Sequence, residues 1–332
     1  MDDVVTCFLR DPRTGEVLLL RRSDETGSYP RRWGAVSGYV ECEDTDEDAE
    51  REIREETGVD GATRVRRGDG FVVEDDEYGD WRVHPYLYDT PTREVTTNYE
   101  TERLDWCAPT EVLRRETVPR LRDSYAAVGP SVETVAEDDE HGSAYIAARA
   151  LEVLRDTAAT ETFDEAREKA RELTEARPSM DVVGNRVARA ADADTVEELE
   201  KKAHRAISEG YRADEKAAEN AAERLVDADH VVTVSRSGTV AATLERFDGS
   251  VAVAESLPGG EGIGFAEEVD AWTVVPDTCV PDAVRGTDAV VVGAGSVLPD
   301  GTAVNKLGSL AAALAAGRFG RPVLVVPPGG QV

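Results

Sequence analysis

The sequence predicts an α/β and α+β protein: a mixed sheet with one inserted helix, then a helical bundle that leads into a parallel α/β domain. Three observations predict it. At 332 residues the chain is longer than one hydrophobic core usually supports. Its first third has short apolar runs around one strong helix signal. Its last third has continuous apolar runs alternating with helical segments, which is typical of a parallel sheet buried on both faces.

The first part, residues 1–128, is expected to be built on strands joined by short turns. The expected strands span residues 4–9, 16–20, 64–73 and 81–88. A turn-rich spacer at 11–15 joins the first two as a hairpin. The inserted helix has Thr45 as a capping residue, three acidic residues in its first turn and Gly58 at its end. Residues 109–127 are expected to form a helix that closes this part.

The remainder divides into three segments. Residues 129–142 combine Pro130 with an acidic run and little apolar content, which predicts a linker. Residues 143–228 have apolar residues at helical spacing, which predicts a bundle of about four helices. Residues 229–332 form the parallel α/β domain. Its expected strands span residues 231–234, 251–254, 273–275, 289–292 and 323–326.

The charge composition restricts location and partners. Asp and Glu number 68 against 38 Lys and Arg, a formal charge of -30, and 40% of residues are apolar. This acidic surface indicates a folded protein kept soluble in a halophilic cytoplasm, where salt screens self-repulsion. It disfavours direct contact with nucleic acid or anionic membranes. No window approaches ~18 apolar residues, so no membrane span is expected. The four cysteines lack pairing or ligand spacing and are expected to be reduced thiols.

Three glutamates of the inserted helix share one face. Glu52, Glu55 and Glu56 lie at i, i+3 and i+4, where three like charges repel unless a cation sits among them. Such oxygen ligands suit Mg²⁺ or Mn²⁺, which bridge to substrate phosphates. Arg51 is placed to pair with Glu55 one turn on. The alternative is a solvated face of an acidic protein.

The string from Arg51 to Val59 resembles the Nudix signature at every defined position. Glu43 has the signature spacing, whereas Gly38 lies one residue too close. The resemblance implies an α/β/α sandwich and a hydrolase that acts on a phosphoric anhydride bond, in a nucleoside diphosphate linked to another group.

The same resemblance implies roles for particular residues. Glu55 and Glu56 would be metal ligands, Glu52 a ligand or the general base, and Arg51 a catalytic partner. A carboxylate from a later loop completes the site in some members, and three candidates remain open: Glu94, Glu100 and Glu102. Three arginines are candidates for binding the substrate phosphates, or are ordinary surface charges: Arg21, Arg22 and Arg32.

The C-terminal part contains a possible anion site. Residues 290–309 predict a strand, a turn at 300–301, a short strand and a helix from Asn305. A helix N-terminus beside Asn305 and Lys306 would bind an anion, unless Asn305 only caps the helix and Lys306 is solvated.

Four blocks in this part carry a second resemblance: residues 141–143, 176–180, 231–237 and 293–308. They resemble the family that unites the alpha, beta and delta subunits of translation initiation factor 2B with methylthioribose-1-phosphate isomerase and ribose-1,5-bisphosphate isomerase. The pairing with an acidic Nudix part is of haloarchaeal type. The resemblance implies a Rossmann-like domain, a homo-oligomer formed through this part, and a small phosphorylated ligand. The ligand-binding candidates are Arg177, Ser235, Asn305 and Lys306.

The chain departs from the isomerases at residues that carry their chemistry. Ser235 and Gly295 occupy the places of their cysteine and aspartate, and His141 that of an arginine. A serine is a weaker acid than a thiol, and glycine transfers no proton. Isomerase activity is therefore disfavoured.

Three functions remain open. The first is a Nudix enzyme with a C-terminal domain that binds a nucleotide or sugar phosphate. The second is a non-catalytic translation or regulatory factor, and the third is a bifunctional sugar-phosphate isomerase. The intact glutamates favour the first over the second.

Overall fold

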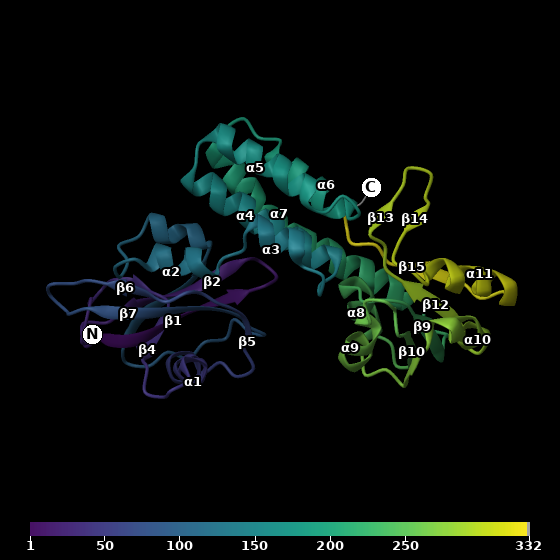
Figure 1. Cartoon of the computed structure of the whole chain (residues 1–332), viewed down its shortest axis with the longest axis horizontal. Helices are drawn as coiled ribbons and strands as arrows, with labels where there is room; N and C mark the ends of the chain where they lie inside the picture. The colour runs from purple at the N-terminus through teal and green to yellow at the C-terminus, as the bar shows by residue number, and fades with distance from the viewer. Residues whose placement is uncertain (331–332) are drawn as a thin grey trace. The chain divides into compact units, whose positions relative to one another are not determined.

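The computed structural model describes residues 1–330 and divides into two compact units, Met1–Pro130 and Ser131 to the end of the chain (Figure 1). Each unit has its own hydrophobic cores. The fold class predicted from the sequence is confirmed: a mixed sheet in the first unit, then a helical bundle and a parallel sheet in the second. No helix within residues 1–330 is long and apolar enough to cross a membrane.

Unit 1 is built on one mixed sheet. Its strands are β1 (Asp2–Asp11), β2 (Glu16–Arg22), β3 (Trp33–Gly34), β4 (Val36–Tyr39), β5 (Thr63–Arg67), β6 (Phe71–Val73), β7 (Trp81–Asp89) and β8 (Thr101–Cys107). The central order is β3-β2-β1-β7-β5, with β4 paired to β1, β6 to β7 and β8 to β2. The β1–β7 pair is parallel, and the expected hairpin joins β1 to β2.

Alternation along β1 places a helix on each face of this sheet. Val5, Cys7 and Leu9 pack towards α1 (Thr45–Thr57), whereas Phe8 packs towards α2 (Leu121–Val128). The result is a sandwich with the sheet as its middle layer.

The single closing helix expected at 109–127 is wrong. The structure has a 3₁₀ helix, η1 (Pro109–Leu113), then an irregular stretch, and α2 begins at Leu121. Pro119 has no N–H to donate, and Arg120 adopts a positive φ of 56°, so the helix is interrupted there.

Unit 2 begins with helices. They are α3 (Val132–Glu137), α4 (Ser143–Thr160), α5 (Phe163–Ala176), α6 (Asp181–Ala191) and α7 (Val196–Glu223). Helices α4 to α7 correspond to the four expected. Helix α3 lies inside the expected linker at 129–142: Ser131 and Thr134 form a capping box, and Val135 is buried in the bundle core. The acidic composition of this segment therefore led to a linker being predicted where the chain forms a short helix.

The parallel sheet follows the bundle. It contains β9 (His230–Thr233), β10 (Ser250–Ala254), β11 (Thr273–Val275), β12 (Ala289–Val292) and β15 (Val323–Val325), in the order β11-β10-β9-β12-β15. All five expected strands are present. Because β10 and β12 flank β9 on opposite sides, the chain reverses direction across the sheet between β9 and β12. Ligands of such sheets bind at the carboxyl ends of the strands at this point.

Helices cover both faces of the parallel sheet. Helices α7, α8 (Gly238–Leu244) and α9 (Glu261–Glu268) pack on one face. The short 3₁₀ helix η2 (Asp277–Cys279) precedes α10 (Val280–Arg285), and α10 and α11 (Ser309–Phe319) pack on the other.

The hairpin of β13 (Ser296–Val297) and β14 (Ala303–Val304) leads into α11. The helix expected from Asn305 therefore begins four residues later, after Gly308 with a φ of 93°.

Candidate functional site

The glutamate helix of unit 1 is α1. The Asp44 side chain caps its start by accepting a hydrogen bond from the Asp46 N–H at 3.0 Å. Gly58, with a φ of 67°, ends it by donating to the Arg54 carbonyl at 2.9 Å. The face of α1 that carries Glu52 and Glu56 packs against β4, which contains Ser37 and Gly38.

Glu52 and Glu56 are buried, whereas the Glu55 side chain is 60% exposed. The predicted set of three neighbouring glutamates is therefore only partly brought together. Within residues 1–330, no group of three or more His, Cys, Asp or Glu side chains is already arranged as a metal centre.

Burial and like charge act on both inner glutamates. Burial raises the pKa of Glu56 to about 8, and the charges of Glu52 and Glu100 add to the rise. Against this, the Ser37 N–H donates to Glu56 Oε1 at 3.2 Å. Burial also raises the pKa of Glu52, although the guanidinium of Arg51 lies 3.0 Å from its Oε1 and opposes the shift. Two carboxyls are thus held in a place that disfavours their charge.

Gly38 makes room for Glu52. A Cβ at position 38 would lie 2.0 Å from Cδ of Glu52, so no other residue fits there without moving the carboxyl. The glycine whose spacing departs from the signature is thus next to the Glu52 carboxyl. The adjacent Ser37 supplies the N–H to Glu56.

Glu100 is the later-loop carboxylate that faces this pair. Its charge acts on both Glu52 and Glu56. Glu102 instead pairs with Arg21 at 3.2 Å, and Glu94 is exposed. When charged, the two buried carboxyls and Glu100 repel one another, and a divalent cation among them would remove that repulsion.

Arg51 is held by several oxygen atoms. Its guanidinium lies 2.7 Å from Asp48 Oδ1 and 3.8 Å from Glu55 Oε2, and donates to the Tyr39 carbonyl at 3.1 Å. Asp48 is fully buried and also accepts hydrogen bonds from the Glu41 and Cys42 N–H groups at 3.0 Å. Asp48 therefore fixes the loop before α1. Asp48 lies three residues before Arg51 on the same helix face, so the sequence alone could have indicated that the two side chains pair.

Only one of the three candidate arginines lies beside the glutamates. The charge of Arg22 opposes the raised pKa of Glu56, and its Nη1 lies 3.4 Å from Ser37 Oγ. Arg21 pairs with Glu102, and Arg32 lies 3.6 Å from Glu116. Arg22 also lines a cleft in unit 1. Its other lining residues include Thr6, Tyr29, Ser37, Tyr39, Trp81 and Val118.

A second cavity lies in unit 2 at the carboxyl ends of β9 and β12, the position that the sheet order favours. It is lined by His141, Ser179, Arg236, Ser237, Asn305 and Lys306, among others. The Gly293 backbone also lines it, and a Cβ there would lie 2.6 Å from Ser237 Oγ. The cavity is thus formed by segments far apart in the chain.

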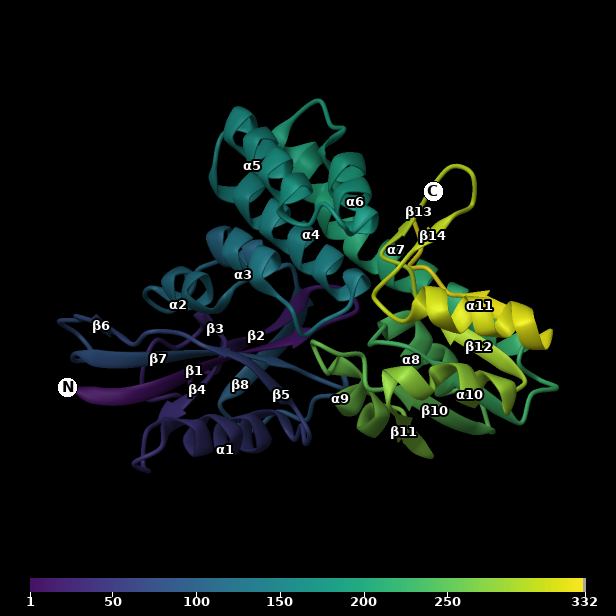
Figure 2. The same ribbon diagram turned by 45° about the vertical axis from the view of Figure 1, so that its right-hand side comes forward.

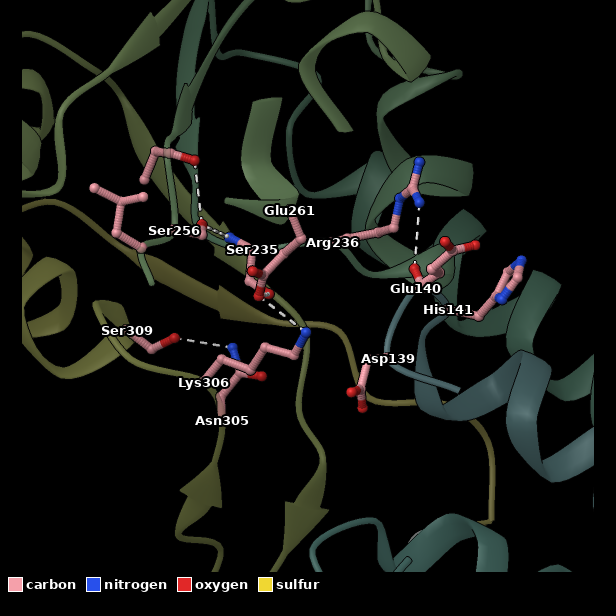
Figure 3. Close-up of polar contacts among 12 residues, drawn as sticks. Asp139, Glu140, His141, Ser235, Arg236, Ser256, Glu261, Asn305, Lys306 and Ser309 are labelled. Carbon is pink, nitrogen blue, oxygen red and sulfur yellow. Dashed lines mark hydrogen bonds and ion pairs between the residues drawn. The ribbon is translucent and has the colours of Figure 1, made fainter. Parts of the chain in front are cut away.

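Glu261 holds the two candidate polar groups beside this cavity. Lys306 Nζ and Ser235 Oγ each donate to Glu261 Oε1 at 2.9 Å (Figure 3). Burial acts to raise the pKa of Glu261, but hydrogen bonds from Lys306 and Ser235 help to lower it below its usual range. Glu261 was not among the residues predicted from the sequence, since nothing in its local pattern shows that the start of α9 lies beside Lys306.

The other C-terminal candidates have different surroundings. Asn305 Nδ2 donates to Ser309 Oγ at 2.9 Å while the residue lines the cavity. Arg177 does not line it: its Nε donates to the Val135 carbonyl at 2.8 Å, and its Nη2 bonds the Asp138 carbonyl. Arg177 therefore fastens α3 to the bundle.

Gly295 has no room for a side chain. A Cβ there would lie 2.9 Å from the Ser179 carbonyl oxygen. An aspartate at this position would therefore require the backbone to move.

Known protein families match both parts of the chain. The model of the initiation factor 2 subunit family matches residues 139–330, and that of the NUDIX domain matches residues 2–128. A ribose 1,5-bisphosphate isomerase from Haloterrigena turkmenica is 32% identical over 225 residues, covering 60% of this chain and 69% of that protein.

Two solved structures are also similar. The translation initiation factor eIF-2B of Pyrococcus horikoshii is 23% identical, with a TM-score of 0.55, over 58% of this chain and 75% of that one. The MutT protein of Methanosarcina mazei is 26% identical, with a TM-score of 0.32, over 38% of this chain and 90% of that one.

The fold and the two sites define an α/β protein in which a sandwich with a glutamate helix is followed along the chain by a parallel α/β domain with a cavity at the carboxyl ends of its strands. The chain belongs to the initiation factor 2 subunit family and carries a NUDIX domain at residues 2–128.

Proposed function

We propose that unit 1 is a Mg²⁺- or Mn²⁺-dependent pyrophosphohydrolase that acts on a nucleoside diphosphate linked to another group. The observation that carries this proposal is the buried pair Glu52 and Glu56, faced by Glu100 and bordered by Arg22. Such a site serves a reaction in which a water oxygen attacks phosphorus and a P–O bond of the anhydride breaks.

Each residue has a distinct part in this reaction. Glu52, Glu56 and Glu100 would hold the cation, which when bound offsets phosphate charge and makes a bound water more acidic. Glu52 is also the candidate base that accepts the proton of the attacking water. Its partner Arg51 keeps it oriented at 3.0 Å. Arg22 would bind a phosphate oxygen, and the apolar cleft beside it would exclude water from the non-reacting group.

The experiment incubates the chain with a panel of nucleoside diphosphate derivatives in molar KCl with Mg²⁺ and measures the nucleoside monophosphate that is formed. Glu56→Gln should lower kcat/KM by roughly 10²-fold or more, the scale of a lost catalytic group. Glu50→Gln is the matched control, because Glu50 is exposed on the same helix. Hydrolysis that is unaffected by Glu56→Gln would refute the assignment, and no turnover across the panel would favour a recognition role for this fold.

We propose for unit 2 a binding site for a small phosphorylated ligand, without sugar-phosphate isomerisation. Lys306, Arg236 and Asn305 beside the cavity support binding, and Ser235 and Gly295 argue against the isomerase reaction. Because a ribose 1,5-bisphosphate isomerase is among the similar proteins, conversion of that sugar phosphate is the alternative to test. Ribose 1,5-bisphosphate incubated with the full chain should remain unconverted by ³¹P NMR while raising the melting temperature. Robust conversion would overturn this proposal and establish a bifunctional enzyme.

A further inference from the structure

Two cationic side chains line the cavity of unit 2, and each is already paired with a carboxylate. These side chains are Lys306 and Arg236. Lys306 Nζ donates to Glu261 Oε1 at 2.9 Å (Figure 3), and Arg236 Nη2 lies 3.0 Å from Glu268 Oε2. An anion that enters the cavity therefore meets cations whose charge is already offset by the protein itself.

Both carboxylates belong to α9. Glu261 is the first residue of this helix and Glu268 is the last. Seven residues make nearly two full turns of an α-helix, so the two side chains lie on the same face. The two ion pairs therefore come from one helix face that is turned towards the cations of the cavity.

Helix α9 is fixed in this position. It lies beside β10 and β11 (Figure 2), and Phe265 is fully buried in the core that α9 shares with α7 and α8. Gly262 packs so closely on the end of β10 that a Cβ there would lie 1.8 Å from the Ala254 carbonyl oxygen. The helix thus holds its carboxylates at the cations through its own packing on the sheet.

Glu261 has a second partner that remains if Lys306 leaves. Ser235 Oγ also donates to Glu261 Oε1 at 2.9 Å. Ser235 is itself buried, and its N–H donates to Ser256 Oγ at 2.8 Å. If Lys306 turned from Glu261 to a ligand, the carboxylate would keep the hydrogen bond from Ser235. Exchange of the lysine between the two anions therefore leaves no bare charge behind.

The hydrogen bonds of Arg236 are incomplete in this arrangement. Its Nη1 donates to the Glu140 carbonyl at 3.2 Å (Figure 3), and its Nη2 faces Glu268. Its Nε is buried and has no hydrogen-bond partner within residues 1–330. A guanidinium with an unused donor gains from an anion with several acceptor oxygens, such as a phosphate group.

We propose that α9 is an internal competitor for the ligand of this cavity: Glu261 and Glu268 hold the two cations until an anionic ligand displaces them. This inference rests on the phosphate site proposed for unit 2. A free phosphate ion forms ion pairs only by breaking existing ones, so its net gain is small. A phosphorylated ligand with a further polar part also reaches Ser237 and Asn305, which line the same cavity. Helix α9 thereby selects against inorganic phosphate and other simple anions.

Isothermal titration calorimetry of the full chain with inorganic phosphate tests this competition. A chain that carries both Glu261→Gln and Glu268→Gln should bind phosphate roughly tenfold more tightly than the wild type, because a partly exposed ion pair is worth up to about fivefold in affinity. The matched control is Glu267→Gln, since Glu267 is exposed on the same helix. In molar KCl its distant charge is screened, so this control should leave the affinity unchanged. Thermal melting of each chain checks that the fold is kept.

A double-mutant cycle separates competition from simple repulsion between Glu261 and phosphate. If Lys306 must leave Glu261 to bind the anion, the gain from Glu261→Gln should become smaller when Lys306→Met is also present, because no ion pair then has to break. A gain of the same size with and without Lys306 would overturn the proposal. Equal affinity in the wild type and the double glutamine variant would also overturn it, while leaving the phosphate site in place. Absence of phosphate binding in every chain would refute the site and the competitor together.

Discussion

Replacing Glu56 by glutamine should stabilise the metal-free protein and at the same time remove its response to Mg²⁺. The carboxyl is buried, and its pKa is raised from 4.5 to about 8. A carboxyl whose pKa is raised on folding destabilises the folded protein only where the unfolded chain would be ionised. For Glu56 this destabilisation is absent below pH 4.5, and it grows as the pH rises to about 8. The loss in free energy of unfolding is about 3 kcal/mol at pH 7, at about 1.4 kcal/mol per pH unit, and it falls below about 1 kcal/mol near pH 5.

Glutamine has no charge to bury and keeps the oxygen that accepts from the Ser37 N–H. In EDTA at pH 7 and molar KCl, Glu56→Gln should therefore raise the melting temperature by several degrees, at ~2–4 °C per kcal/mol for a chain of this size. The gain should shrink at pH 5. Mg²⁺ should raise the melting temperature of the wild type more than that of the variant. A variant that melts below the wild type in EDTA, or a gain that does not depend on pH, would refute the reasoning. Glu50→Gln, on the exposed side of α1, should show neither effect.

Three further results are expected. Gly38→Ala should lower kcat/KM by roughly 10²-fold with little change in folding, because the new Cβ would lie 2.0 Å from Cδ of Glu52 and must displace that carboxyl. Steady-state kinetics would show the loss of activity, and circular dichroism would show that the fold is kept. Unchanged kinetics would argue against a role for Glu52. Asp48→Ala should lower the free energy of unfolding, measured with urea, by about 2 kcal/mol, since two N–H groups and Arg51 lose their buried acceptor. A free energy of unfolding equal to that of the wild type would mean that these groups find other partners. Glu261→Gln should tighten binding of inorganic phosphate several-fold in calorimetry, because it frees the charge of Lys306, and unchanged affinity would place the anion elsewhere.

Much of the fold follows from local pattern. The continuous apolar runs predicted all five strands of the parallel sheet, because residues buried on both faces leave an unbroken signal. The glutamate helix was fixed by its acidic first turn and by Gly58, which ends it with a positive φ. Where a short element depends on contacts with distant residues, the local pattern does not reveal it. Helix α3 is held by Val135 in the bundle core and by Arg177, which donates to the Val135 carbonyl, and the acidic segment around α3 indicates neither contact.

The sequence by itself determined the chemistry available in unit 1: carboxylates at helical spacing, with arginines nearby. Only the tertiary structure decided which of them act together. It separates the exposed Glu55 from the buried Glu52 and Glu56 and brings the charge of Glu100 to them from the turn before β8. It also sets Glu261 against Lys306, 45 residues away in the chain. The physical reason is that burial and distance between side chains far apart in sequence fix their charge and partners, and neither quantity is a local property of the chain.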